Sequence, residues 1–184
     1  MLSLPGPAAL SEFRRSRLLA NLQVQLPQLQ TLHARYLHFI DLDGVLDSGQ
    51  REHLDGLLSY GEAAPDASGG QTVLVVPRFG TISPWSSKAT DILHICGLDR
   101  VRRVERGIEY RLQADTPLSN GELESVAPLL HDRMTEAFLL DESKAAGLFE
   151  THPPAPLGII PLLAEGPDAL IRANRDLGLA LSSG

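Results

Sequence analysis

The sequence has one cysteine, few aromatic residues and no long hydrophobic run. Cys96 alone among 184 residues excludes an internal disulfide and a cysteine-rich metal site. Aromatic residues make up 5% of the chain, too few to predict a platform for stacking bases. No run approaches the roughly 18 apolar residues of a membrane span, and no basic segment followed by an apolar run opens the chain. We therefore expect a cytoplasmic protein with no membrane partner.

Charge and composition narrow the class further. A net charge of −7 and a pI near 5.3 argue against a nucleic-acid partner, because neutralising phosphates requires a basic face. Apolar residues at 43% and charged residues at 21% are typical of a globular protein. At 184 residues, the chain is long enough for one domain with an appendage or for two small halves that share a core.

The most informative stretch is residues 75–92, which reads VVPRFGTISPWSSKATDI. It predicts a buried strand, a turn that contains glycine and the start of a helix. Ser83 is a natural N-cap, and Pro84 would occupy the first helical position, where a missing N–H costs nothing. The helix should end at Gly97. Its predicted apolar face comprises Trp85, Ala89, Ile92, Leu93 and Cys96, with Cys96 as a small core residue.

Polar side chains gather at the start of this helix in a number that exceeds what capping requires. They are Thr81, Ser83, Ser86, Ser87, Lys88 and Thr90. One interpretation is a phosphate site, because helix N-termini attract anions. The other is an interface turn whose hydroxyls satisfy backbone groups, and the absence of a Gly-x-x-x-x-Gly-Lys loop favours it. We predict a domain-docking surface made of Arg78, Thr81, Ser83, Trp85, Ser86, Ser87 and Lys88.

The second half of the sequence resembles the first at a constant offset of 72 residues. Asp43 matches Asp115, Leu46 matches Leu118, and six of the 16 positions from 43 to 58 are identical at this offset. The predicted elements correspond too: strand 1–4 with 72–76, helix 8–23 with 84–96, strand 34–42 with 106–114, and helix 49–58 with 121–130. We predict an α+β fold of two β-α-β-α halves related by a pseudo-twofold axis, with antiparallel sheets covered by helices.

The chain after the duplication reads as a separate region. We place the duplicated domain at 1–140 and a linker region with a terminal helix at 141–184. Residues 136–149 have helical stretches, and the proline-rich run 152–156 predicts an extended linker. The last helix should begin after Gly166. Its apolar side, formed by Leu170, Ala173, Leu177 and Leu181, has no visible partner, which suggests that the chain is a fragment.

Residues 78–92 resemble the N-terminal signature of the phosphoribosylformylglycinamidine synthase family. The resemblance extends over nearly the whole chain, from residues 10–13 through 106–107 and 131–134 to 173–174. In that family these residues form only the first domain and the start of a linker. The first domain is similar to a dimer of a small subunit that other organisms encode separately, which agrees with the duplication.

This resemblance implies a function for the chain. The parent enzyme converts formylglycinamide ribonucleotide, glutamine and ATP to formylglycinamidine ribonucleotide, glutamate, ADP and phosphate. Its catalytic nucleophile and its ATP and Mg²⁺ ligands lie in domains that this chain does not contain. The resemblance therefore implies a segment with no catalytic, cofactor or metal residues of its own. Its role would be to sit against the synthetase and glutaminase domains and to help organise ammonia transfer.

A second function class stays open, a small phosphatase. Residues 39–48, FIDLDGVLDS, resemble the first motif of haloacid-dehalogenase-type phosphatases. In that interpretation Asp41 attacks phosphorus, Asp43 acts as the acid/base and Mg²⁺ binds the same carboxylate. The remainder of that family's pattern is poorly matched, because Ser87 and Lys88 are adjacent and the acidic pair at 141–142 lacks its glycine. The six histidines are scattered, and no two share a short metal-ligand spacing.

Overall fold

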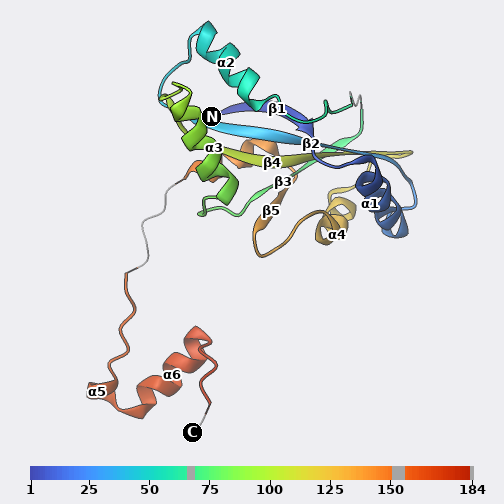
Figure 1. Ribbon diagram of the computed structural model, residues 1–184. Coiled ribbons are helices and arrows are strands. Elements are labelled where there is room, and N and C mark those ends of the chain that lie inside the picture. The colour runs from blue at the N-terminus through green and yellow to red at the C-terminus, as the bar shows by residue number, and fades with distance from the viewer. Residues whose placement is uncertain (66–68, 151–155, 183–184) are drawn as a thin grey trace. The chain divides into compact units, whose positions relative to one another are not determined.

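Five strands form one antiparallel sheet in the computed structural model, which describes residues 1–65, 69–150 and 156–182. The strand order is β1-β2-β4-β3-β5 (Figure 1). The first compact unit comprises residues 1–151 and the second residues 152–184. The elements of the first unit are β1 (Leu2–Ala8), α1 (Glu12–Gln25), β2 (Leu29–Leu42), α2 (Ser48–Leu58), β3 (Gln71–Pro77), α3 (Pro84–Ile95), β4 (Val101–Ala114), α4 (Asn120–Leu130), β5 (Glu136–Leu139) and the 3₁₀ helix η1 (Glu142–Phe149).

The predicted α+β fold of alternating strands and helices is confirmed, and so is the 72-residue offset. The helix caps show it most clearly. Ser11 caps α1 and Ser83 caps α3, each by accepting a backbone hydrogen bond in the first turn. Asp47 and Ser119 cap α2 and α4, and both belong to a capping box that satisfies two backbone N–H groups. Equivalent local side chains therefore start equivalent helices in the two halves.

The two long central strands carry the pseudo-twofold axis. β2 and β4 run antiparallel, and Tyr36 pairs with Ile108. These two residues are themselves 72 positions apart, so the pair maps onto itself when the halves are exchanged. Arg35 pairs with Glu109, and exchange of the halves turns this pair into the one between Leu37 and Gly107. The axis therefore passes through the middle of the sheet at Tyr36 and Ile108.

The outer strands obey the same symmetry with one difference. Ile40 of β2 pairs with Leu2 of β1, and its counterpart Leu112 of β4 pairs with Gln71 of β3. Ile40 and Leu112 therefore occupy equivalent strands, as the duplication requires. However, Leu2 and Gln71 are 69 positions apart, so the second half has gained three residues between its first strand and its helix.

All four α-helices of the first unit cover one face of the sheet. The residues of β2 and β4 that they contact lie at alternate positions along each strand, and alternate side chains of a strand point to the same face. α1 and α4 lie together over one end, and α2 and α3 over the other (Figure 1). η1 covers part of the opposite face through Ala145 and Leu148, which pack with Phe39 and Val76. The sheet is thus a central layer with an α-helical layer on one side.

Two strands are longer than predicted, because β1 continues past residue 4 and β4 begins before residue 106. Pro5 and Pro7 do not end the first strand, since β1 is an edge strand with an irregularity between Pro5 and Ala8 and can tolerate missing N–H donors. Residues 106–107 do not divide β4, which is continuous. Gly107 is needed there because a Cβ would approach the Val75 carbonyl oxygen to 2.7 Å.

The region after α4 also differs from expectation. The spacing of Leu123, Val126, Ala127 and Leu130 with Met134 predicts that Met134 lies on the same apolar helix face. The helix ends at Leu130, and Met134 lies exposed in the following turn. Residues 136–139 form the edge strand β5, which pairs with β3. η1 packs into the first compact unit, whereas the sequence predicts a linker region from residue 141. Most of the predicted proline-rich linker, residues 152–155, lies outside the described residues.

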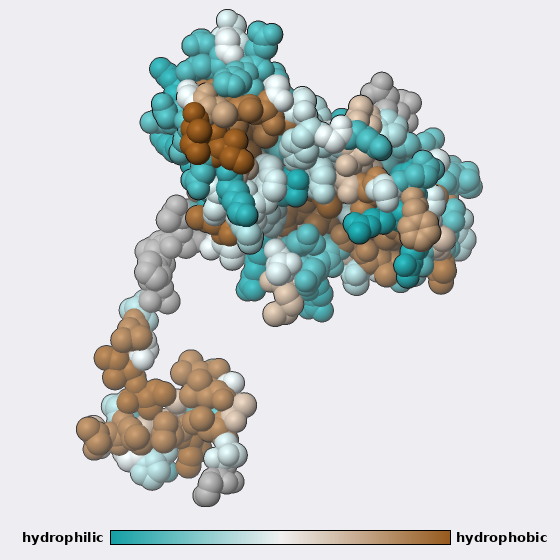
Figure 2. All heavy atoms as spheres, in the orientation of Figure 1, coloured by the Kyte–Doolittle hydropathy of each residue, from teal (hydrophilic) through white to brown (hydrophobic). Residues whose placement is uncertain are grey.

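The second unit contains the predicted terminal helix. α5 spans Leu162–Glu165 and α6 spans Pro167–Leu177, with Gly166 between them at φ 67°. α6 ends before Leu181, so that residue does not extend its apolar side as predicted. Figure 2 shows that the surface of this unit is largely apolar. Within residues 1–65, 69–150 and 156–182, no helix has the length and apolarity needed to cross a membrane.

Candidate docking groove

The signature segment forms the loop between β3 and α3 and the first turns of that helix. The loop runs from Arg78 to Ile82, and the Ser83 hydroxyl accepts a hydrogen bond from the Ser86 amide at 3.0 Å. Pro84 stands at the start of the helix, as predicted. Of the predicted docking residues, Arg78, Thr81, Ser87 and Lys88 are exposed, Ser83 and Trp85 are half-buried, and Ser86 is buried.

Several of the surplus hydroxyls have internal partners, which the sequence did not reveal. The Thr81 hydroxyl donates to the Arg78 carbonyl at 2.6 Å and tightens the loop. The Thr90 hydroxyl accepts from the Val104 amide at 3.1 Å, so α3 satisfies the edge of β4 where β3 has diverged from it. Ser86 is the exception, because its buried hydroxyl has no hydrogen-bond partner within the described residues. The segment therefore serves both internal satisfaction and surface exposure.

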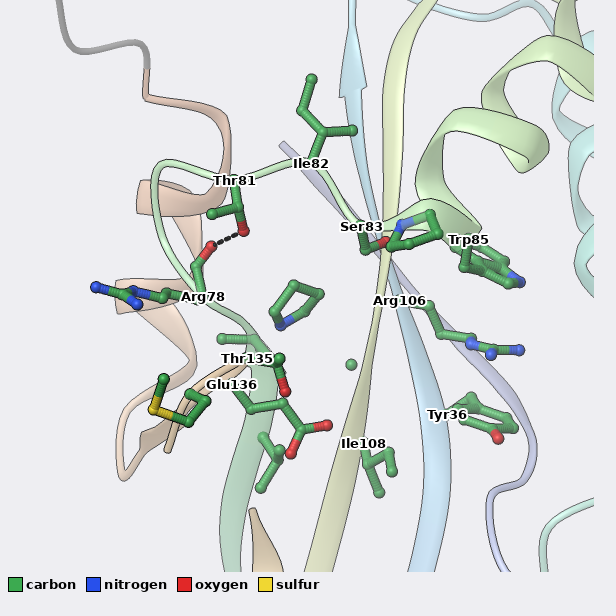
Figure 3. A pocket seen from close by; sticks show the side chains of 16 residues that line it. Tyr36, Arg78, Thr81, Ile82, Ser83, Trp85, Arg106, Ile108, Thr135 and Glu136 are labelled. Atoms are coloured by element: carbon green, nitrogen blue, oxygen red, sulfur yellow. Dashed lines mark hydrogen bonds between the residues drawn. The ribbon is translucent and has the colours of Figure 1, made fainter. Parts of the chain in front are cut away.

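A groove of about 560 Å³ opens beside this loop on the pseudo-twofold axis. Figure 3 shows Arg78 and Glu136 on its β3 side, and Arg106 and Tyr36 on the side of β4 and β2. Its floor contains Ile108, the axis residue of β4. The lining is mainly apolar, with a few charged and hydroxyl groups at its rim. A groove of this size and composition suits a peptide segment or a small molecule.

Arg106 is fixed at one side of the groove by two aromatic rings. Its guanidinium lies 4.1 Å from the ring centre of Tyr36 and 4.7 Å from that of Trp85. Contacts of a guanidinium with aromatic faces contribute about 0.5–2 kcal/mol each. Arg106 also donates a hydrogen bond to the Tyr60 hydroxyl at 3.0 Å. The groove wall is therefore held by contacts between β2, β4, α3 and the segment that follows α2.

His38 extends this stack into the core. Its ring is stacked on Trp85 with a centroid distance of 5.7 Å, and its Nε2 lies 2.9 Å from the Tyr60 hydroxyl oxygen. Burial, assisted by the positive charge of Arg106, lowers the pKa of His38 from 6.5 to about 4. The neutral ring can then accept a hydrogen bond from Tyr60, while Tyr60 accepts one from Arg106. Below, Tyr36, His38, Tyr60, Trp85 and Arg106 are called the aromatic stack.

The duplication provides an internal comparison for this site. In the first half, two residues separate the end of β1 at Ala8 from the cap Ser11; in the second, five separate Pro77 from Ser83. The three residues gained by the second half therefore lie in the loop from Arg78 to Ile82. This loop forms one wall of the groove.

Two side chains of the stack also break the symmetry. The counterpart of Trp85 is Phe13, which is 73% exposed on α1, and the counterpart of Arg106 is Ala34. The first half folds into the same elements without a longer loop, an indole or a guanidinium. These departures from symmetry border one groove, so they mark a place specialised for something other than folding.

The acidic motif at Asp41 and Asp43 is not arranged as the phosphatase interpretation requires. Asp41 lies on β2 within an antiparallel sheet, and Asp43 forms an ion pair with Arg102 at 2.8 Å. Asp43 also donates its amide to the Arg100 carbonyl, so it belongs to a turn. In the described parts of the chain, no group of three or more His, Cys, Asp or Glu side chains is placed to hold a metal ion.

Cys96 is not the core residue that the sequence suggested. It is the C-terminal cap of α3 and is half-buried, with a free thiol. Ile92 on the same predicted face is 54% exposed, and Ile95 is 85% exposed. Figure 2 shows the resulting apolar patch over α3. The buried residues of the helix are Ser86, Thr90 and Leu93, and Trp85 and Ala89 pack partly buried beside them.

Sequence reasoning missed the residues that face the signature segment across the groove. Tyr36 and Arg106 lie in predicted strands with nothing to distinguish them, and Glu136 lies in a stretch predicted to have helical segments although it belongs to β5. The 72-residue offset alone relates every position of one half to a position of the other. Tyr36 is located on the symmetry axis only by its pairing with Ile108 in the structure.

The comparison with known families agrees with these observations. The family described as formylglycinamide ribonucleotide amidotransferase N-terminal matches residues 35–149. The match covers more than half of the chain and includes β2 from residue 35 onwards, the signature loop and all of the groove lining. Nothing in it favours a phosphatase. The chain therefore belongs to the family of formylglycinamide ribonucleotide amidotransferase N-terminal domains, which are non-catalytic parts of an enzyme of purine biosynthesis.

Proposed function

We propose that this domain docks against the synthetase and glutaminase domains of its parent amidotransferase and helps to couple them. The docking surface is the groove together with the exposed face of the signature loop. The parent enzyme would use glutamine, ATP and Mg²⁺, all bound outside this segment, in the cytoplasm. The role of the domain is to hold the other domains in the arrangement in which ammonia released from glutamine reaches the synthetase site.

The concentration of asymmetric features around one groove supports this proposal most directly. Arg78 and Thr81 are exposed although the loop that carries them is tied down internally, and Lys88 is exposed near the start of α3. Ordering an exposed cationic loop has an entropic cost, so it is expected where a partner surface benefits from a preformed shape. Arginine and aromatic residues are also the types that dominate the centres of protein interfaces.

Charge reversal at the loop and at the start of α3, in the complete enzyme, tests the proposal. The variants Arg78→Glu and Lys88→Glu should reduce glutamine-dependent product formation at least tenfold, since a like charge placed at an interface costs about 1–2 kcal/mol or more. The rate with added ammonium salt in place of glutamine should change less than twofold. Matched controls are Arg14→Glu on α1 and Lys144→Glu on η1, both exposed and away from the groove. Equal loss of both rates, or no loss of either, would contradict a coupling role.

A further inference from the structure

Glu105 is an acidic residue buried within the sheet. It lies on β4, and its side chain is fully buried. Nearby, Arg103 approaches its carboxylate to 3.8 Å through Nε. A buried carboxylate is costly unless hydrogen bonds and opposite charge compensate it. Its position therefore needs a reason beyond filling space.

The carboxylate receives two hydrogen bonds from one residue of the signature segment. The Ser83 amide donates to one oxygen at 3.2 Å, and the Ser83 hydroxyl donates to the other at 2.7 Å. Because that hydroxyl donates its hydrogen to Glu105, its lone pairs are free to accept a hydrogen bond from the Ser86 amide, at 3.0 Å. Glu105, Ser83 and Ser86 thus form a directed chain from the sheet to the start of α3. A negative charge at this end of the helix is also favourable.

The first half of the duplication shows what helix formation alone requires. Its cap Ser11 accepts from the Arg14 amide at 3.4 Å and is exposed. The residue equivalent to Glu105 there is His33, so this cap lacks the counterpart of the buried carboxylate. α1 nevertheless forms with the same geometry at its start, with the cap residue in an extended conformation. The carboxylate is therefore an addition specific to the half that carries the longer loop.

We infer that Glu105 is a positioning residue that fixes the signature loop in the shape needed for docking. The inference depends on the proposed function, because it assigns the cause of the preformed loop shape. The loop from Arg78 to Ile82 connects β3 to Ser83, and Glu105 anchors the C-terminal end of this loop to the sheet. Without that anchor, Ser83 can still cap α3, as Ser11 caps α1, but the loop is free to take other conformations.

Glu105→Gln in the complete enzyme tests the inference. A glutamine keeps the size of the side chain but offers one acceptor oxygen in place of two, so one Ser83 hydrogen bond is lost. A charge-assisted hydrogen bond of this kind is worth about a factor of ten to one hundred. We expect glutamine-dependent product formation to fall at least tenfold, with the ammonia-dependent rate changed less than twofold. Glu124→Gln, on the exposed side of α4, is the matched control.

A double-substitution cycle separates positioning from a general loss of stability. If Glu105 acts through Ser83, then Ser83→Ala, Glu105→Gln and the double variant should show the same loss of coupling within about twofold. The losses should remain at temperatures well below each variant's unfolding midpoint. The inference would be overturned if the loss in the double variant were the product of the two single losses. It would also be overturned if the ammonia-dependent rate fell in parallel. If Arg78→Glu impairs coupling and Glu105→Gln does not, the positioning role fails while the docking proposal stands. If neither impairs it, the docking proposal fails as well.

Discussion

The neutral state of His38 makes the stability of this domain depend on pH in a calculable way. Its ring is fully buried, and burial together with the Arg106 charge lowers its pKa from 6.5 to about 4. Protonation would turn Nε2 into a donor and leave Tyr60 as the shared acceptor of two cations. The unfolded chain binds this proton more readily than the folded one. The stability that His38 contributes is therefore complete above pH 6.5 and is lost as the pH falls towards 4.

The size of the effect follows from the two pKa values. A pKa lowered from 6.5 to about 4 corresponds to about 3 kcal/mol once the pH is below both. Between pH 7.5 and pH 5, the part that is lost is about 2 kcal/mol. Carboxylates also contribute to acid sensitivity, so the histidine contribution must be isolated by comparison with a variant. His38→Gln keeps an uncharged acceptor near the position of Nε2 and cannot be protonated.

The assay is urea unfolding of the 184-residue chain from pH 7.5 to pH 5, followed by circular dichroism. The parent should lose about 2 kcal/mol more than His38→Gln over this range. His53→Gln, which removes an exposed imidazole from α2, serves as the matched control and should follow the parent. Parallel curves for the parent and His38→Gln would refute the reasoning, as would an NMR titration midpoint for His38 near 6.5.

Two further predictions concern the sheet and the absence of chemistry in this segment. Gly107→Ala should lower the free energy of unfolding by about 1–3 kcal/mol, because its Cβ would meet the Val75 carbonyl oxygen at 2.7 Å. Gly121→Ala, with no atom within 4 Å of the added carbon, should be neutral or stabilising in the same urea titration. Equal effects would show that β4 can shift. The isolated chain should release no glutamate from glutamine, because Cys96, the one cysteine in the sequence, is the C-terminal cap of α3 and the nearby His94 is engaged with the Val101 carbonyl. Release that disappears in Cys96→Ala would contradict this.

The duplicated fold could be predicted from the sequence because its signals are local. Caps such as Ser83 and Asp47 act on backbone groups within three residues, and the leucines that follow them report the buried face of each helix. β5 was not predictable in this way. Its four residues are too few to show an alternation, and its pairing with β3 depends on partners 59–65 residues earlier in the chain. η1 was missed as part of the core for the same reason.

Only part of the candidate site could be predicted from the sequence. The signature segment stands out in the sequence because its composition is unusual, but which of its hydroxyls are free depends on other strands. Thr90 is used by Val104, and Ser83 by Glu105. Neither partner can be recognised without the register that brings β4 beside α3. The opposite wall of the groove comes from strands with unremarkable sequences, so only the structure identifies it.

Joining the two halves in one polypeptide has a consequence for how the axis can change. In a dimer of identical subunits, every substitution appears twice, and a groove on the axis must look the same from both sides. Here the two sides of Tyr36 and Ile108 are encoded separately, so one loop could lengthen while its counterpart stayed short. The shared sheet keeps both halves folded, and each half is free to carry residues that the other could not tolerate. A fused pair can therefore present a surface whose two sides differ in sequence and shape to a partner that is itself asymmetric.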